Sequence, residues 1–476
     1  MEVDKGPAEV ISALTASAHL SNDDSTESDL EYDHKFRRRA LLKVDFWLVG
    51  FYSMVYIFRV IDSSNYSNAA IINLERGTGI KKELHFDPNQ WAWTLSIFSY
   101  SYLIFEPTNT LLLKKVRPSR WMFVLILAWG ICASSVAAVQ DFQGMMCARF
   151  AIGMAEAGFY PAVLFHMAFW YTPAEMPWRI AAFYSVGQLS SALSGLLAYA
   201  IGFMDGLGGL AGWRWLFLLE GLPAMILAVI ALFGLPDYPE TARMLTEDER
   251  TFFSRRLPST APSGKTKRSW DWKKLEKLMA DPSVYTFSLY WLAHGIGGFG
   301  ISFALPTVIY ELGFTTTSLS QLMNIPPYVA CFLFLNTCGY MLHRKWIRPW
   351  TTAVAIEGTT IVCYIILITV PSAVVRYLAL IVAVSCAGSA YPVIWPERIR
   401  VLEGTVAAGF GIGLTNAFAQ FGGIVGPHVY STVFGPRYRV SYIICLSFLV
   451  VSISSILVSW LIIWRRDKKR AALGEE

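Results

Sequence analysis

The chain has 476 residues, of which 54% are hydrophobic and only 16% are charged. Soluble domains carry about 25% charged residues, so this composition excludes an ordinary soluble protein and indicates a chain that lies mostly in lipid. The net charge of +5 does not indicate nucleic-acid binding, because the basic residues cluster between apolar segments. The seven cysteines lie in or beside those segments without a CxxC pair, which predicts packing residues rather than disulfides or a metal site.

The N-terminal segment 1–44 is polar and acidic and ends in the basic run HKFRRRALLK. It contains too little apolar surface to form a core, so we expect a disordered tail. A basic cluster directly before an apolar segment marks the cytoplasmic side of a membrane. The tail is therefore predicted to be cytoplasmic.

Apolar segments long enough to cross a bilayer follow one another along the rest of the chain. We place them at 45–66, 91–113, 121–139, 149–171, 180–203, 213–235, 283–309, 320–342, 349–369, 376–394, 405–427 and 439–464. Basic residues mark alternate loops, which puts both termini on the cytoplasmic side. The small-residue-rich fifth and eleventh segments lie six segments apart, as in the parallel repeats of transporters. The predicted fold is all-α, with about twelve transmembrane helices in two pseudo-symmetric six-helix bundles, 45–235 and 283–464.

Residues 236–282 form the only long polar segment between the two predicted bundles. Thr246 and Glu249 match a capping box, which predicts that a short helix begins there. The sequence WDWKKLEKLMADP has an apolar face opposite its lysines, which is typical of a helix lying on the inner membrane surface. We expect a cytoplasmic loop here, and a short cytoplasmic tail at 465–476.

The first span carries Arg59 and Asp62 on one helical face. An arginine and an aspartate three residues apart can neutralise each other locally, which is the structural interpretation. Alternatively, the buried carboxylate exchanges a proton, or the arginine is released to bind an anion.

The fourth span, RFAIGMAEAGFYPAVLFHMAFWY, places Arg149, Gly153, Glu156 and Tyr160 on one face. Ionisable groups at membrane depth usually face a protein interior or a water-filled cavity. A packed structural pair and a direct role in substrate or proton binding are both open. Gly153 and Gly158 predict the close approach of another helix.

Three sets of candidate residues follow from the polar positions in these spans. The substrate cavity is predicted to involve Arg149, Tyr160, Gln188, His294, Asn416 and Gln420. Proton coupling is predicted to involve Asp62, Glu156, Glu220 and Glu357. Gating at the inner loop after the second span is predicted to involve Glu106, Lys114 and Lys115. A lone histidine such as His294 is more often a satisfied hydrogen-bonding residue than a proton relay.

From Asp45 to Trp464 the chain resembles the major facilitator superfamily, and more narrowly the fungal allantoate permease-like family of anion:cation symporters. The resemblance rests on the order and spacing of seven motifs: IDSSNYSNA, LLLKKVRPSRW, RFAIGMAEAGFYPAV, GLGGLAGWRWLFLLEGLPA, LPDYPETARMLTEDER, NIPPYV and NAFAQFGGIVGPHVY. Members of that family import small organic anions or ureides with protons, among them allantoate, nicotinate, pantothenate and biotin. The chain departs from the family pattern at Ser63, where a basic residue is usual, and in the loops GYMLHRKWIRP and PERIRVLEG.

The expected function is therefore proton-coupled uptake of a small organic anion by alternating access. Efflux of a secondary metabolite is the first alternative, but the fifth span, GQLSSALSGLLAYAIG, lacks the Gly-Pro run typical of drug antiporters. A nutrient receptor on a transporter scaffold is the second alternative. No nucleophile–base pair or phosphate loop indicates an enzyme. We expect a monomer in the plasma membrane, surrounded by lipid, with no nucleic-acid partner, metal or cofactor other than the coupling proton.

Overall fold

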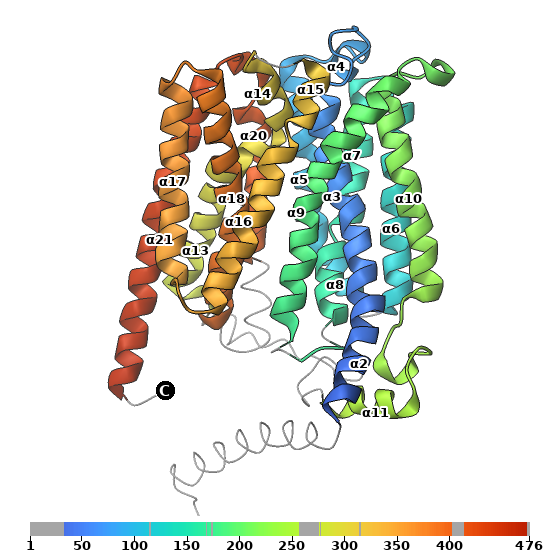
Figure 1. Cartoon of the computed structure of the whole chain (residues 1–476), viewed down its shortest axis with the longest axis vertical. Helices are drawn as coiled ribbons and strands as arrows, with labels where there is room; N and C mark the ends of the chain where they lie inside the picture. The colour runs from blue at the N-terminus through green and yellow to red at the C-terminus, as the bar shows by residue number, and fades with distance from the viewer. Residues whose placement is uncertain are drawn as a thin grey trace, which may run out of the picture.

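A computed structural model describes residues 33–113, 116–167, 169–172, 175–256, 276, 278–313, 316–401 and 414–473. These residues are helical or irregular and include no β-strand. The helices run side by side in two groups (Figure 1). We call them the N half, helices α3 to α10, and the C half, helices α13 to α21. Several predicted features lie outside the described residues: residues 1–32 of the predicted tail, Lys114, Lys115 and most of the predicted surface helix before Pro282.

The N half contains α3 (Phe51–Ala69), α4 (Ile80–Glu83), α5 (Pro88–Leu113), α6 (Pro118–Ser135), α7 (Phe142–Glu156), α8 (Phe159–Met167), α9 (Met176–Ile201) and α10 (Gly212–Gly234). It is preceded by α2 (His34–Val44) and followed by α11 (Glu247–Arg256). The C half contains α13 (Pro282–His294), α14 (Leu305–Glu311), α15 (Thr317–Leu322), α16 (Ile325–His343), α17 (Pro349–Thr369), α18 (Ala373–Val401), α20 (Phe421–Val429) and α21 (Arg439–Leu473). In Figure 1, α2, α11 and the end of α21 lie at one end of the molecule, here the terminal end, and α4, α14 and α15 lie at the distal end.

Among the described residues, eight helices are long and apolar enough to cross a membrane, and a ninth is added if the bent pair Pro282–Phe303 and Leu305–Glu311 is one span. Every predicted span contains helix within the described residues. The first span is longer than predicted, because helix continues without a break from His34 to Ala69 and so includes part of the predicted tail.

The fourth span differs from the single helix that its apolar run predicts. Helix α7 ends at Glu156 and α8 begins at Phe159 after a turn. The physical reason is Pro161, which has no N–H to donate to the carbonyl four residues earlier and whose ring crowds that carbonyl. The break leaves Glu156 at the C-terminal end of a helix in the middle of the bundle.

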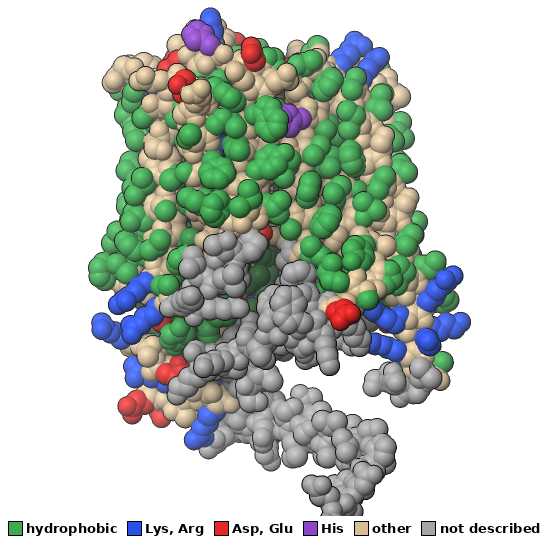
Figure 2. Space-filling view, turned by 180° about the vertical axis from the view of Figure 1, so that it is seen from behind, with side chains coloured by type: hydrophobic (Ala, Val, Ile, Leu, Met, Phe, Trp, Pro, Cys, Tyr) green, Lys and Arg blue, Asp and Glu red, His purple; other side chains and the backbone are tan. Residues whose placement is uncertain are grey.

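The outer surface of the two halves is apolar, as a lipid environment requires. Phe46, Ile226 and Phe233 are 74%, 62% and 84% exposed. Figure 2 shows hydrophobic side chains over a broad middle band, with Lys and Arg side chains toward its two ends. A surface of this kind is stable in lipid and would drive aggregation in water.

Local predictions at two positions are confirmed. The Thr246 amide donates to Glu249 Oε2 at 2.9 Å and the Glu249 amide donates to Thr246 Oγ1 at 3.3 Å, which is the predicted capping box. A Cβ atom at Gly153 would lie 2.5 Å from the Phe98 carbonyl oxygen, so α7 and α5 approach as closely as the glycine predicts.

The halves meet mainly where α9 packs against α16 and α5 packs against α20, and α15 and α14 also contact α9 and α3, respectively. At the distal end the contact is hydrogen-bonded. Ser67 Oγ donates to the Phe303 carbonyl at 2.8 Å, and Ser96 Oγ donates to the Ile424 carbonyl at 2.7 Å. The distal end is therefore closed.

Candidate functional site

The main charged cluster lies inside the N half, where α3, α7 and α10 face one another. Arg59 Nε lies 2.9 Å from Glu156 Oε2, and the two side chains are 18% and 1% exposed. Neither carboxylate oxygen of Glu156 accepts a hydrogen bond with good geometry, and neither does Arg59 Nε donate one. The pair is thus a close contact of charges without an aligned hydrogen bond. Arg59 pairs across helices here, and not with Asp62 one turn along its own helix.

Two further carboxyl groups complete this cluster. Trp129 Nε1 on α6 donates to Asp62 Oδ2 at 3.1 Å, and Asp62 Oδ1 has no hydrogen bond within the described part of the chain. Asp62 also interacts with Glu156 and with Glu220. Glu220 on α10 is 6% exposed, and neither of its oxygens has a hydrogen-bond partner among the described residues.

Arg149 lies deeper in the N half than Arg59. Its Nε donates to the Thr94 carbonyl at 3.0 Å, and its guanidinium carbon lies 3.6 Å from the Tyr66 ring centroid and 4.8 Å from that of Phe98. The residue is 5% exposed. These contacts hold a cation in place by one hydrogen bond and two aromatic faces. Of the two arginines, Arg59 is the one whose side chain is partly open.

The C half holds a different pair. His294 Nδ1 on α13 lies 2.7 Å from Glu357 Oε1 on α17, and His294 Nε2 lies 3.2 Å from the Ala387 carbonyl oxygen. Both side chains are buried, at 4% and 0% exposure. Tyr290 stacks on the imidazole at 5.7 Å between ring centroids. Both ring nitrogens therefore have partners, and the histidine lies inside the half.

Polar residues from both halves meet on the face between them. Asn416 Nδ2 donates to Glu106 Oε1 at 3.0 Å, so Glu106 contacts the other half from within α5. Its role in gating at the inner loop stays a prediction. Ser185 Oγ and Asn336 Oδ1 are 3.4 Å apart. Gln188 Oε1 accepts a 3.9 Å contact from the thiol of Cys331. The predicted residues Tyr160 and Gln420 are partly exposed, on α8 and directly before α20.

Aromatic residues at this interface were missed by the sequence analysis. Tyr184 on α9 stacks on Tyr391 of α18 at 5.4 Å, and Tyr391 stacks on Trp395 at 4.7 Å. In sequence they resemble the many aromatic residues that face lipid. Their spacing of four residues along α18 is the one signal that would have placed Tyr391 and Trp395 on a common face.

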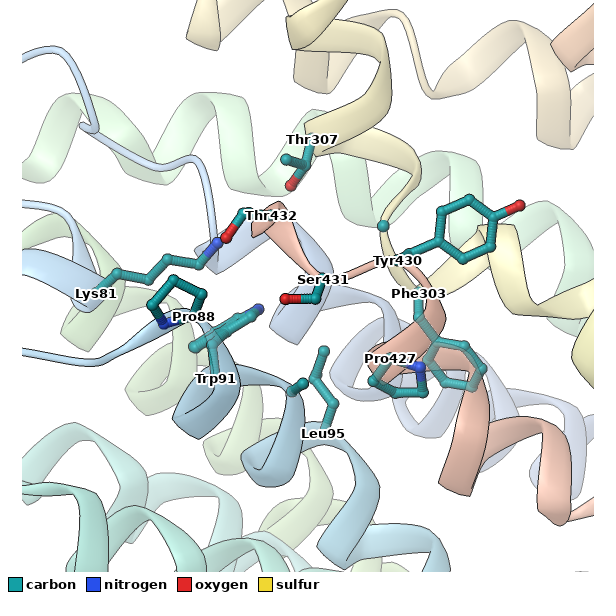
Figure 3. A pocket seen from close by; sticks show the side chains of 12 residues that line it. Lys81, Pro88, Trp91, Leu95, Phe303, Thr307, Pro427, Tyr430, Ser431 and Thr432 are labelled. Atoms are coloured by element: carbon teal, nitrogen blue, oxygen red, sulfur yellow. The ribbon is translucent and has the colours of Figure 1, made fainter. Parts of the chain in front are cut away.

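A small pocket lies between the halves at the distal end (Figure 3). Lys81 from the N half and Thr307, Ser431 and Thr432 from the C half surround the same space. Burial lowers the pKa of Lys81 to about 8, although the opposite charge of Glu311 raises it.

The described residues contain no group of three or more His, Cys, Asp or Glu side chains able to hold a metal ion.

Comparison with known proteins agrees with this architecture. A family model described as Major Facilitator Superfamily matches residues 53–427. The protein named MFS transporter prlL, from Fungal sp. (strain NRRL 50135), is 32% identical over 296 residues, which cover 62% of this chain and 59% of that protein. A protein named putative tartrate transporter, from Agrobacterium vitis, is 29% identical over 399 residues, which cover 82% of this chain and 84% of that protein.

Among solved structures, a bacterial homologue of the human lysosomal transporter Spinster, in an inward-facing and unoccupied conformation, superposes with a TM-score of 0.66. The match covers 91% of this chain and 99% of that chain at 13% sequence identity, so the likeness is one of fold.

Proposed function

This chain belongs to the major facilitator superfamily, and from that premise we propose that it takes up a small organic anion together with protons by alternating access. We further propose that it belongs to the allantoate permease-like branch. The motifs between Asp45 and Trp464 support that placement. The relative named as a putative tartrate transporter is consistent with an anionic substrate, because tartrate is a dicarboxylate.

The observation that carries the proposal is the state of Arg59. Its side chain is partly exposed, and its Nε, which lies 2.9 Å from Glu156 Oε2, has no aligned hydrogen bond within the described part of the chain. A guanidinium presents a planar set of donors that matches a carboxylate in bidentate fashion. Arg59 is therefore the first candidate for the anion-binding residue. The predicted substrate contact of Arg149 stays a prediction, and its stacking on Tyr66 makes it a support for the cluster.

Charge balance supports the coupling of substrate to protons. The cluster contains three carboxyl groups, on Asp62, Glu156 and Glu220, and two guanidinium groups, on Arg59 and Arg149. An uncompensated charge is costly to bury. Because two guanidiniums can balance only two carboxylates, we expect one of the three carboxyl groups to hold a proton. A substrate anion that binds Arg59 removes the counter-charge of Glu156, and this carboxylate then binds a proton in turn. Binding of the anion and of the proton favour each other, as symport requires.

We propose that the distal end faces the outside of the cell and the terminal end faces the cytoplasm of a fungal cell, with the carrier in the plasma membrane. The basic residues that flank the spans at the terminal end support this orientation. Protease cleavage of intact cells tests it directly. External cleavage at residues 258–270, within the predicted cytoplasmic loop 236–282, would contradict the proposed orientation.

Uptake of labelled organic acids by transport-deficient yeast that expresses the chain tests the function. We expect accumulation of at least one monocarboxylate at pH 5, a much lower level at pH 7.5, and loss of accumulation when an uncoupler collapses the proton gradient. Uptake that ignores both pH and the uncoupler would contradict symport. Loss of preloaded anion from cells, accelerated by an inward proton gradient, would favour efflux by antiport.

A further inference from the structure

Three aromatic rings form a continuous stack across the two halves. The Tyr184 and Tyr391 rings lie 5.4 Å apart with an interplanar angle of 22°, and Tyr391 and Trp395 lie 4.7 Å apart with the same angle. Tyr184 belongs to the N half, and the other two belong to the C half. Near-parallel rings at these distances have the offset geometry that aromatic groups prefer. The stack therefore lies where the halves meet, with the Tyr391 ring between those of Tyr184 and Trp395.

The stack differs from a core cluster in its exposure. Tyr184, Tyr391 and Trp395 are all partly exposed, whereas Trp291 behind them is 4% exposed. Trp291 lies 5.5 Å from both Tyr391 and Trp395, with its ring inclined to theirs. A buried ring thus fixes the position of two open ones. Rings that only pack the core would be fully buried. The partial exposure of these three rings therefore indicates a role beyond packing.

Arg59 borders the same region. The Tyr160 hydroxyl interacts with Tyr391 and lies within the electrostatic reach of Arg59. The Arg59 guanidinium carbon is 5.9 Å from the centroid of Tyr56, whose ring packs at 4.3 Å on Phe183, the neighbour of Tyr184. Tyr56 and Tyr160 thus link Arg59 to the stack, because both interact with Arg59 and with the rings of Tyr184 and Tyr391.

We propose that this site selects anions in which a planar, conjugated ring is attached to the carboxylate. The inference rests on the proposed function, because it assigns the carboxylate to Arg59 and adds the ring surface as the second determinant. A flat ring extends this stack by packing on its outer ring, Tyr184, through dispersion and quadrupole terms that depend on planarity. A saturated ring of similar area gains the same hydrophobic burial but not the stacking. Aliphatic dicarboxylates and ureides lack this second contact.

The matched probes are benzoate and cyclohexanecarboxylate, which share the carboxylate and a six-membered ring and differ in planarity. We measure their binding to the full-length chain purified in detergent, by titration calorimetry at pH 5.5, and their uptake as labelled compounds in yeast. Binding of benzoate is expected to be about tenfold tighter, since a stacked aromatic pair accounts for about one factor of ten in affinity. Tyr184→Leu and Tyr391→Leu should each reduce this ratio toward one.

Two controls separate stacking from a loss of folding. Tyr184→Phe keeps the ring and should keep the ratio. Tyr340→Leu removes an aromatic ring that is 51% exposed on α16 and is not part of the stack, and it should also leave the ratio unchanged. An equal affinity of the two probes in the unmodified chain, or a tenfold ratio that survives both leucine variants, would overturn the inference while leaving anion transport intact. Failure of the proposed function is a separate result, in which no carboxylate in the wider panel binds or enters.

Discussion

The two halves use corresponding helices to hold buried charge in different ways. In the N half, Trp129 on the third span, α6, donates to Asp62 on the first span, α3. In the C half, Glu357 on the third span, α17, contacts His294 on the first span, α13. The N-half cluster has more carboxyl groups than guanidiniums, and several of its carboxylate oxygens have no hydrogen-bond partner among the described residues. The C-half pair contains one acid and one base, and both histidine nitrogens have partners.

The difference separates two tasks. A cluster with an open cation and unpartnered oxygens has groups available for a ligand and a proton, whereas a matched acid–base pair mainly fixes the packing of its helices. We therefore expect the N half to carry substrate and proton binding. The C half is expected to supply the aromatic surface and a rigid partner for the motion. The predictions below test this division of roles.

The largest effect is expected for Arg59→Lys. The lysine keeps the charge but loses the planar pair of donors, so the KM for the transported anion should rise about a hundredfold, as loss of two charge-assisted hydrogen bonds implies. Surface expression should stay near normal. Uptake kinetics and surface labelling measure both quantities. Arg344→Lys, at an exposed position directly after α16, is the matched control.

Arg149→Lys decides between the two arginines. The sequence alone predicts a sharp loss of transport for this variant. In the structure the Arg149 side chain is buried against the Tyr66 ring, so we expect the variant to lose thermal stability as well as transport. If Arg149→Lys raises the KM with normal stability, and Arg59→Lys does not, substrate binding belongs to Arg149.

The second effect concerns the coupling carboxylates. Asp62→Asn or Glu156→Gln should reduce pH-driven accumulation to equilibration, yet spare exchange of substrate between loaded compartments, because the neutral side chain cannot carry the proton. Accumulation and exchange are measured in proteoliposomes with an imposed pH gradient. Glu247→Gln, exposed on α11, is the control for removing a glutamate. If both single variants still accumulate substrate, neither residue is the coupling site, and Glu220 and the C half become the candidates.

The third effect is smaller and lies in the C half. Glu357→Gln keeps a hydrogen-bond acceptor for His294 but removes the charge, and it should lower the free energy of unfolding by about 1–3 kcal/mol. Accumulation driven by pH should persist. Thermal unfolding of the purified chain and transport in proteoliposomes measure the two. A variant that loses pH-driven accumulation but keeps its stability would contradict the division of roles, because the C half would then also carry a coupling proton.

The sequence predicted the all-helical membrane fold and the order of its spans, since hydrophobic length and basic loops respond to the bilayer directly. It also predicted which spans carry buried charge. It did not predict the break between α7 and α8 in the fourth span. It could not predict that Arg59 pairs with Glu156 and not with Asp62. Helical spacing shows which residues share a face of one helix, but not how that helix is rotated relative to its neighbours. The stack of Tyr184 and Tyr391 was out of reach for the same reason, since it joins residues more than two hundred positions apart.

The smallest effect concerns Lys81, which lies between the halves at the distal end. Its Nζ is 5.1 Å from the centroid of the Trp91 ring, and burial lowers its pKa from 10.5 to about 8, with Glu311 opposing the shift. The unfolded chain keeps its proton up to about pH 10.5, so between pH 8 and 10.5 the folded chain binds fewer protons than the unfolded one. Stability therefore rises with pH in that window, and below pH 8 the cost of burying the charged amine is fully present.

Lys81→Met removes the charge and keeps the length of the side chain. The variant should therefore lack the rise in stability between pH 8 and pH 10.5. Thermal unfolding of the purified chain at pH 7 and pH 9.5 measures it. The variant should be more stable than the unmodified chain at pH 7, by about 2 °C, and the difference should shrink at pH 9.5. Lys82→Met, on the exposed neighbour, should show no such change. If Lys81→Met is instead less stable at both pH values, the attraction to Glu311 outweighs the cost of burial. Charge would then hold the two halves together at the distal end, and the division of roles would no longer confine the functional charges to the N half.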